Sequence, residues 1–495
     1  MNLQFSRITC TSVMAALLCG NFPQSVSARP EVALPATQSG QFVREWLKEC
    51  QAPDVEQMTK WLTTHFSDEA AKRGGGIGQV TTQNSAEICN TNGGFRIDAV
   101  HDSDPSSVSL VVVGSKSNIW FDLTLATDTA GKIAELYIQP TTPAESSLPK
   151  DLSDASIERE VRQIVTRLDE EGLFSGIVVV ARGSKAIVSS SAGYASRTSH
   201  SAITGSTQFT LGSLGKMFTA TAIGQLVDRH ELSFDDTVGK FFPEYPNKTV
   251  RDKVTVGMLL SHTDGLGDFL RKRTPEMMQN GVKRASEFMP LYDGDEPQFE
   301  PGTQWAYSNA GLALAGAIVE KASGEDYPDY IRRHVFALAG MTHSDPNNIP
   351  HRSAQMVTPY TKITKTGPSP DWREAPYDIG SPAGGALSSA DDLVRFADAL
   401  RSGQLVSKAT FEEMTKTHGP MPPGFKYGYA MGIEDVYGRT FVGHNGGFPG
   451  VSTHLYMLLD SPYTVVVLSN RDPPAEAYAG SQIAALIVEK AKVGK

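Results

Sequence analysis

The chain has 495 residues, of which 40% are hydrophobic and 20% charged, and its formal net charge is −10. This composition is typical of a folded globular protein and excludes a collagen-like, disordered or disulfide-built chain. The acidic balance and the lack of a Lys/Arg cluster argue against a nucleic-acid partner. No apolar run reaches the roughly 18–20 residues that cross a bilayer.

The first 28 residues have the pattern of an export signal. Arg7 supplies a positive charge, residues 13–18 lie in a short apolar stretch, and residues 26–28 place small side chains before a cleavage point. A membrane anchor is disfavoured because the stretch is short and interrupted, and lipoprotein processing at Cys19 is disfavoured by the large Leu18. We expect cleavage after Ala28, and a periplasmic or secreted protein without a transmembrane segment.

Removal of the signal would leave two cysteines, Cys50 and Cys89. In an oxidising compartment an even pair favours a disulfide. The bridge would close a loop of about 40 residues. By lowering the entropy of the unfolded chain, it would stabilise the fold by about 4 kcal/mol. Two isolated cysteines are weak evidence for catalysis or zinc binding, so we expect a structural disulfide.

Residues 38–140 have the pattern of a small α+β domain. Apolar residues recur at helical spacing in two segments, and four strand-like runs follow. The helical faces are Phe42, Val43, Trp46, Leu47 and Cys50, then Val55, Met58, Trp61, Leu62 and Phe66, and the strands are residues 95–99, 108–112, 121–125 and 133–138. Two helices before a four-stranded meander resemble the NTF2-like and cystatin-like folds, in which a curved sheet wraps around a helix.

Residues 141–154 are rich in Pro, Ser and Thr and predict a linker. The segment 155–495 then opens with an amphipathic helix and a strand pair at 177–181 and 186–190. A mostly helical middle follows, and strands at 440–442, 451–458 and 464–468 precede a C-terminal helix at about 475–491. The strands at both ends of this segment can join one antiparallel sheet, so we expect an α+β domain with the helical part beside the sheet.

Ser213 and Lys216 lie at the predicted start of a helix, where residues three apart project from one face. The helix N-terminus favours negative charge on Ser213, and a buried, neutral Lys216 can take the serine proton. A serine N-cap followed by an exposed lysine explains the same pattern. A nucleophile elbow and a phosphate-binding loop are excluded because Leu211 and Thr210 stand where these motifs need glycine.

Tyr307-Ser-Asn309 follows a turn and enters another predicted helix. A tyrosine there can hydrogen-bond a nucleophile and relay a proton, and an asparagine can hold the lysine and a substrate amide. The structural alternatives are a core aromatic for Tyr307 and a helix cap for Asn309.

His444-Asn-Gly446-Gly447 follows an apolar strand. Glycines at a strand edge allow close approach of a substrate, so the Gly447 N–H can pair with the Ser213 N–H as an oxyanion hole. The alternative is a glycine-rich hairpin beside a structural histidine.

Taken in order, three segments resemble the motifs of the serine β-lactamase/penicillin-binding-protein superfamily: Ser213-x-x-Lys216, Tyr307-Ser-Asn309 and His444-x-Gly446. Over about residues 160–490 the chain is most similar to class C β-lactamases, D-stereospecific peptidases and β-lactamase-like esterases. The resemblance implies an antiparallel sheet flanked by helices, a helical lobe, and an active site between them.

The resemblance also implies roles for the motif residues. Ser213 would be the acylated nucleophile, and Lys216 and Tyr307 would share the general-base role. Asn309 would position the lysine and the substrate. Which of Lys216 and Tyr307 takes the proton stays open. His262 and His343 are interpreted as scaffold residues, since no zinc-spaced set appears, and the chemistry needs no metal or other cofactor.

One position departs from the superfamily pattern. Penicillin-recognising members carry a lysine that helps bind a carboxylate where this chain has His444, which is largely neutral at pH 7. We therefore expect hydrolysis of a small ester, amide or peptide, including D-amino-acid peptides. The alternatives are a slow-turnover penicillin-binding or peptidoglycan-binding sensor protein, and a β-lactamase. The residues 38–140 can be a ligand-binding module or a lid, and we expect loops 269–300 and 359–378 to set the pocket size.

Overall fold

The computed structural model describes residues 33–73, 79–347, 355–364, 367–375, 379–422 and 424–492. The export signal expected in residues 1–28 lies outside these ranges, and the predicted pocket loop 359–378 is described in part. None of the described helices is long and apolar enough to span a membrane.

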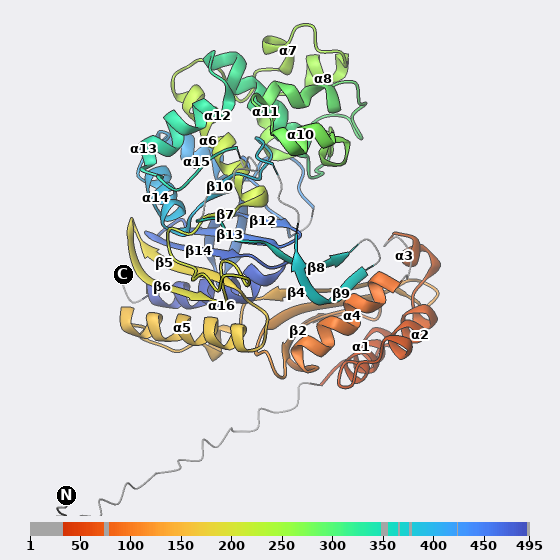
Figure 1. The fold of residues 1–495 in the computed structure, drawn as a ribbon. Helices are drawn as coiled ribbons and strands as arrows, with labels where there is room; N and C mark the ends of the chain where they lie inside the picture. Colours follow the sequence, from red (N-terminus) through yellow and green to blue (C-terminus); the bar gives the residue numbers. More distant parts are fainter. Residues whose placement is uncertain are drawn as a thin grey trace, which may run out of the picture. The chain divides into compact units, whose positions relative to one another are not determined.

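The N-terminal segment holds four helices followed by a four-stranded antiparallel sheet in the order β1-β2-β3-β4 (Figure 1). The elements are α1 (Gln38–Glu49), α2 (Val55–His65), α3 (Asp68–Arg73), α4 (Gln79–Asn92), β1 (Phe95–Ser103), β2 (Ser107–Gly114), β3 (Trp120–Thr127) and β4 (Ile133–Thr141). The two predicted helices and four predicted strands are present. The sequence pattern missed α3 and α4, because α3 is a short helix and the polar sequence of α4 has no continuous apolar face.

The predicted disulfide is also present, and it joins the end of α1 to α4. Cys50 caps the C-terminus of α1, and its Cα lies 4.9 Å from that of Cys89. Next to it the Trp46 ring stacks on Phe95 with centroids 5.6 Å apart. The bridge and the stacked rings thus fasten both helices to the start of β1.

A six-stranded antiparallel sheet dominates the rest of the chain, in the order β11-β12-β13-β14-β5-β6. Its strands are β5 (Gly176–Arg182), β6 (Lys185–Ala192), β11 (Gly432–Val436), β12 (Arg439–Phe448), β13 (Val451–Leu458) and β14 (Tyr463–Ser469). Strands from both ends of the segment meet where β14 pairs with β5, with Val466 opposite Val179. This confirms the predicted antiparallel sheet built from both ends of the segment.

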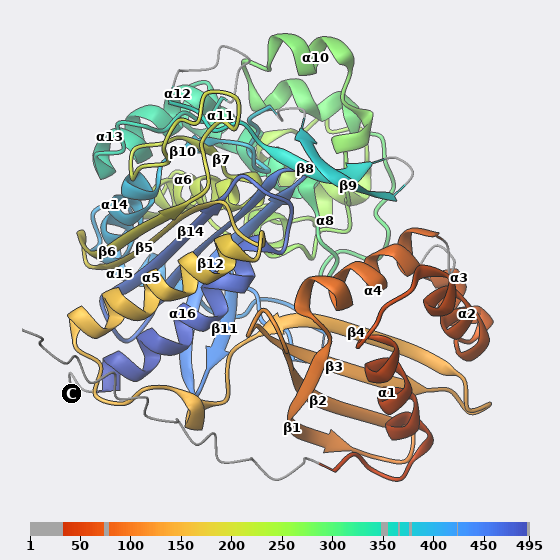
Figure 2. The ribbon, with the colours of Figure 1, turned by 60° about the horizontal axis from the view of Figure 1, so that its bottom comes forward.

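Alternate residues of the central strands face two different apolar layers, as the two-residue period of a strand requires. In β5, Val178 and Val180 pack with α5 (Asp154–Glu170) and α16 (Ala475–Lys492), whereas Ile177 and Val179 pack with the helical part of the fold. Figure 2 shows α5 and α16 on the same face of the sheet. Burial on both faces explains why β5 is an unbroken apolar run.

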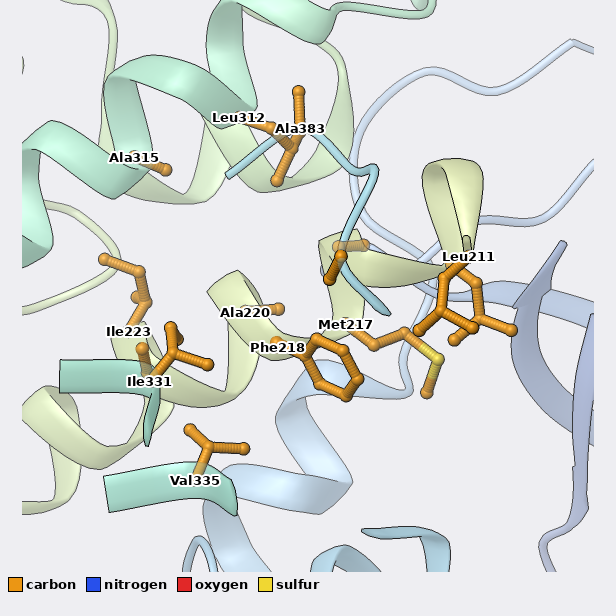
Figure 3. Packing of buried hydrophobic residues seen from close by; sticks show 14 of the residues in the cluster. Leu211, Met217, Phe218, Ala220, Ile223, Leu312, Ala315, Ile331, Val335 and Ala383 are labelled. Atoms are coloured by element: carbon orange, nitrogen blue, oxygen red, sulfur yellow. The ribbon is translucent and has the colours of Figure 1, made fainter. Parts of the chain in front are cut away.

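The helical part packs around α6 (Lys216–Asp228) and α11 (Asn309–Ser323). Figure 3 shows α6 packed against the segment that carries Ile331 and Val335, and Phe218 meets Phe336 edge to face with ring centroids 4.9 Å apart. The remaining helices are α7 (Val238–Phe241), α8 (Lys248–Lys253), α9 (Val256–Ser261), α10 (Pro275–Asn280), α12 (Tyr327–Tyr330), α13 (Ala337–Ala339), α14 (Ala390–Arg401) and α15 (Lys408–Met414). Residues 216–226 of α6 are all buried, so this helix lies inside the layer together with its first residue.

Two short strand pairs complete the fold. β7 (Phe209–Thr210) pairs with β10 (Leu387–Ser388), and β8 (Tyr360–Thr364) pairs with β9 (Gly367–Glu374). The first pair places residues 383–386 beside the segment that follows β7: Leu211 N donates to Ala386 O at 2.9 Å and Gly385 N to Gly212 O at 3.0 Å.

The predicted linker 141–154 connects β4 to α5 and contains a short 3-10 turn, Glu145–Ser147. Apolar residues of the first sheet and of α5 and α16 belong to one cluster, in which the Phe121 and Tyr478 rings meet with centroids 6.2 Å apart. The division into domains 38–140 and 155–495, like the NTF2-like or cystatin-like resemblance, stays a prediction.

Candidate active site

Ser213 lies on a 3-10 turn (Gly212–Gly215) that runs directly into α6. The turn begins at Gly212, whose φ of +55° suits glycine. A Cβ at Gly212 would lie only 3.0 Å from Gly447 N. Glycine at this position therefore allows β12 to approach the serine, whose side chain is half-buried.

Lys216 is completely buried, and oxygens surround its amine. Its Nζ lies 3.1 Å from Ser213 Oγ, donates to Asn309 Oδ1 at 2.7 Å and also donates to Ala383 O. Asn309 Nδ2 in turn donates to Asp268 Oδ1 at 3.1 Å, which fixes the orientation of the amide. The alternative of a serine N-cap with an exposed lysine is therefore wrong.

Tyr307 reaches the same serine from the loop before α11. Its hydroxyl is hydrogen-bonded to Ser213, and its ring centroid lies 4.8 Å from Lys216 Nζ. Tyr307 is 38% exposed as a whole residue, and partial burial at its hydroxyl end raises the pKa of Tyr307 above its ordinary value. The phenol therefore keeps its proton at neutral pH.

No hydrogen bond to Ser213 is seen for His444. A chain of hydrogen bonds through His262 and Tyr427 holds its ring instead. Ser308 N donates to His262 Nδ1 at 3.1 Å, so the neutral ring carries its proton on Nε2, which lies 3.1 Å from the Tyr427 hydroxyl. The Tyr427 O–H then donates to His444 Nε2 at 2.8 Å, and His444 Nδ1 donates to Asn445 O. The chain links the second and third motifs.

Both imidazoles in this chain are neutral. Burial and, to a smaller extent, the nearby Lys216 lower the pKa of His444 to about 3. Burial and the same lysine lower the pKa of His262 well below its ordinary value. The third motif therefore presents no cation to a substrate.

The glycines of the third motif lie on an edge of β12 that none of the described strands covers. β11 pairs with β12 only as far as Gly443. Beyond it β12 passes the serine turn so closely that a Cβ at Gly446 would lie 1.9 Å from Leu211 O. Since alternate N–H groups of a strand point to opposite edges, this edge directs backbone N–H groups toward the turn that carries Ser213.

The comparisons with known proteins agree with this arrangement of a serine, a buried lysine and a tyrosine. Residues 161–489 match the family model described as Beta-lactamase. The chain belongs to the beta-lactamase family.

Two relatives and a solved structure place the chain within the family. It is 30% identical over 335 residues to penicillin-binding protein 4* of Bacillus subtilis, which covers 64% of this chain and 73% of that protein. It is 24% identical over 331 residues to a D-aminopeptidase of Cereibacter sphaeroides, covering 64% of this chain and 61% of the relative. The crystal structure of a penicillin-binding protein from Bacillus halodurans superposes with a TM-score of 0.57 at 26% identity, covering 68% of this chain and 99% of the other. The resemblance inferred from the motifs, and the α+β fold that it implied, are confirmed.

In this member of the beta-lactamase family the predicted motif residues converge. Direct contacts join Ser213, Lys216, Tyr307 and Asn309, and the glycine edge adjoins them. His343 lies outside this network, with its N–H donating to Asp392 Oδ2 at 2.6 Å.

Sequence reasoning missed three contributors: Asp268, the Ala383 carbonyl and Tyr427. Asp268 directly follows the glycine-rich segment around His262, and Ala383 lies in a Pro-Ala-Gly-Gly segment that resembles the family, so local signals existed for both. Tyr427 carries no such signal. Among the described residues, no group of three His, Cys, Asp or Glu is placed to hold a metal ion.

A cavity of about 1020 Å³ opens beside Tyr307 and His444. Residues 424–427, strand β11 and the start of α16 form part of its wall, and Asp122 and residues 139–142, at the edge of the first sheet and just after it, form another part. The lining includes no residue of 269–300 and none of the described part of 359–378. Ser213 and Lys216 are not among the lining residues of this cavity, so the expectation that those two loops set the size of the substrate pocket stays a prediction.

Proposed function

We propose that this protein is an exported serine hydrolase that cleaves ester or amide bonds through an acyl-enzyme on Ser213. The observation that carries the proposal is the fully buried Lys216 amine, 3.1 Å from Ser213 Oγ. A nucleophile and a base held at this distance in a water-poor interior are what acyl transfer requires.

Lys216 acts as the base in its neutral form. Its two remaining N–H groups then donate to Asn309 Oδ1 and Ala383 O, and its lone pair faces the serine hydroxyl. The serine proton moves to Nζ as Oγ bonds to the substrate carbonyl. Tyr307, a neutral phenol, relays this proton to the leaving oxygen or nitrogen.

The Ser213 and Gly447 N–H groups receive the developing oxyanion. Support comes from the closeness of the serine turn to the third motif, where the space at Gly212 is bounded by Gly447 N. Fixed backbone donors of this kind lower the barrier most when they are positioned in advance.

The substrate class follows from His444. A carboxylate-bearing substrate needs a fixed cation, whereas His444 is neutral and its ring nitrogens are engaged by Tyr427 and Asn445. This favours esters and amides, including D-amino-acid amides and peptides, and the likeness to a D-aminopeptidase supports it. The N-terminal signal pattern and the disulfide support a periplasmic or secreted location.

The test is hydrolysis of p-nitrophenyl butyrate by the mature protein and by Ser213→Ala. We expect the substitution to lower kcat at least about 10³-fold, because the acyl-enzyme cannot form. Ser199→Ala, which removes an exposed hydroxyl, is the matched control and should retain full activity. Equal activity of Ser213→Ala and the unmodified protein would refute the proposal.

The second candidate is a slow-turnover penicillin-binding protein, which the likeness to penicillin-binding protein 4* favours. The two candidates differ in deacylation. An adduct of fluorescent penicillin on Ser213 that persists for hours would support the binding protein, whereas turnover within seconds would indicate a β-lactamase. If no penicillin adduct forms and the protein hydrolyses the ester, the result supports an ester or amide hydrolase.

A further inference from the structure

Two arginines and a tryptophan meet away from the active site, and we call them the arginine–tryptophan cluster: Arg197, Trp372 and Arg471. Arg197 follows β6 and is exposed, Trp372 lies in β9, and Arg471 follows β14 and is only 7% exposed. The guanidinium carbons of Arg197 and Arg471 lie 5.9 and 5.1 Å from the Trp372 ring centroid. A third cation, Lys362, places its Nζ 5.3 Å from the same ring.

The positive charge of this cluster is only partly balanced within the described part of the chain, where the Asp169 carboxylate interacts with Arg471 without forming an ion pair. Lys362 has a carboxylate partner, Glu87, at 3.2 Å, but neither Arg197 nor Arg471 forms an ion pair with a described residue. Like charges held together in a partly buried site raise its free energy unless a counter-charge is added. Burial and the charge of Arg197 accordingly lower the pKa of Arg471 to about 10.

Arg471 also has an unused hydrogen-bond donor. Its Nη1 donates to Gly172 O, whereas its Nε is buried and has no acceptor among the described residues. A buried donor without a partner is costly, and such groups in a folded protein point to an absent ligand or water.

Both arginines line a cavity of about 330 Å³, a size that fits a small ligand, whereas Trp372 and Lys362 lie in the lining of a neighbouring cavity that also includes Arg471. Tyr194 and His200 contribute to the same lining, and Asp169 is its one carboxylate among the described residues. No residue of this lining belongs to the cavity beside Tyr307 and His444. The site is therefore separate from the acyl-transfer site.

We propose that the arginine–tryptophan cluster is a binding site for a small oxyanion, a carboxylate or a phosphate. A guanidinium presents paired N–H donors that match two oxygens of either group, and it keeps its charge at any physiological pH. A bound anion would balance both arginines and offer an acceptor to Arg471. The proposal does not depend on hydrolase activity.

The test is a titration of the mature protein with sodium phosphate and, separately, with sodium acetate, at an ionic strength held constant with chloride. We expect a saturable rise in Tm and a change in tryptophan fluorescence, since a ligand that binds only the native state stabilises it. The response to phosphate against acetate identifies which oxyanion the site prefers. Arg197→Gln should weaken binding about tenfold or more, because a charge-assisted contact is lost.

Arg182→Gln is the matched control, since it removes an exposed arginine at the end of β5 and should leave the titration unchanged. Arg471→Lys keeps the charge but loses the paired donors, and should also weaken binding. If Arg471→Lys fails to fold, the titration of Arg197→Gln tests the proposal, because Arg197 is exposed and its substitution leaves the core unchanged. The proposal is overturned if neither anion raises Tm above the chloride reference, or if Arg197→Gln and Arg182→Gln have the same effect.

Discussion

The hydrogen-bond chain from Ser308 to His444 gives each imidazole one donating and one accepting nitrogen. Two neutral histidines can therefore be buried without an unsatisfied nitrogen. Tyr427 is the central member, since its hydroxyl accepts from His262 and donates to His444. The ring of His444 is thereby held at the wall of the cavity that it lines together with Tyr307.

Tyr427→Phe should destabilise the protein and slow catalysis. The substitution removes the partner of a buried N–H and of a buried lone pair, which costs about 1–3 kcal/mol in the free energy of unfolding. Urea denaturation and p-nitrophenyl butyrate kinetics measure both effects, and we expect kcat/KM to fall several-fold because His444 loses its fixed orientation.

Tyr429→Phe is the control for this variant. It removes the hydroxyl of a tyrosine two residues further along the chain and keeps the ring that stacks on His418. Its unfolding free energy should stay within about 0.5 kcal/mol of the unmodified protein. A Tyr427→Phe protein as stable and active as Tyr429→Phe would show that the hydrogen-bond chain has no role.

The relation between β12 and the serine turn decides the site at the level of elements. Thr453 Oγ1 donates to Leu211 O at 2.7 Å, which ties the neighbouring strand β13 to the same turn. Gly446 has no room for a side chain there, since a Cβ would meet Leu211 O at 1.9 Å and Thr453 Oγ1 at 2.6 Å. The close approach of two backbones, and not a side-chain contact, thus aligns the glycine edge with Ser213.

Gly446→Ala should separate β12 from the serine turn. A methyl group at this distance from a backbone oxygen forces a shift of about 1 Å, which lowers kcat/KM roughly 10²-fold when it displaces catalytic groups. Ester hydrolysis and thermal unfolding report the change. Gly294→Ala, where a Cβ meets open space, should alter neither quantity, and unchanged activity of Gly446→Ala would contradict this account of the edge.

The stability of the whole molecule combines buried groups whose pKa shifts have opposite signs. His262 and His444 have lowered pKa values, so they stabilise the native state above about pH 6.5 and this contribution is lost on acidification. Burial raises the pKa of Asp264 to about 7 and that of Glu476 to about 6. Below these pKa values the two acids stay protonated in the native state, whereas in the unfolded chain they ionise from about pH 4. The free energy of unfolding that they contribute is therefore lost as pH rises from about 4 to the native pKa values.

Asp264→Asn should remove one of the opposing contributions. Asparagine keeps the oxygen to which Ser308 Oγ and Leu266 N donate, both at 2.7 Å, but it never ionises. The difference in unfolding free energy between the variant and the unmodified protein should increase in favour of the variant from about pH 4 to pH 7. Its slope should be at most about 1.4 kcal/mol per pH unit, and the difference should stay constant above pH 7.

Urea denaturation of both proteins at pH 5 and pH 8 measures the difference. Asp235→Asn, at an exposed position, is the control and should show no pH-dependent gain. A difference between Asp264→Asn and the unmodified protein that is the same at both pH values would contradict the raised pKa.

The sequence by itself determined what depends on short separations along the chain. Periodicity placed the helices α1, α2 and α5 and the strands of both sheets except β11, because burial of one face repeats every two or 3.6 residues. The spacing of Ser213 and Lys216 placed both on one face of a helix start, and the order of the three motifs identified the superfamily. The helix α4 was missed because tertiary contacts and the disulfide, rather than an apolar face, hold it.

The tertiary structure decided which distant groups meet. Lys216 reaches Asn309 across 93 residues and Ala383 across 167, and no local pattern encodes either contact. The same holds for Tyr427 between two histidines, for the edge of the first sheet in the cavity beside Tyr307 and His444, and for the two arginines near Trp372. Such contacts follow from the packing of whole elements against one another, because burial and hydrogen bonding there are satisfied only when the complete fold brings the partners together.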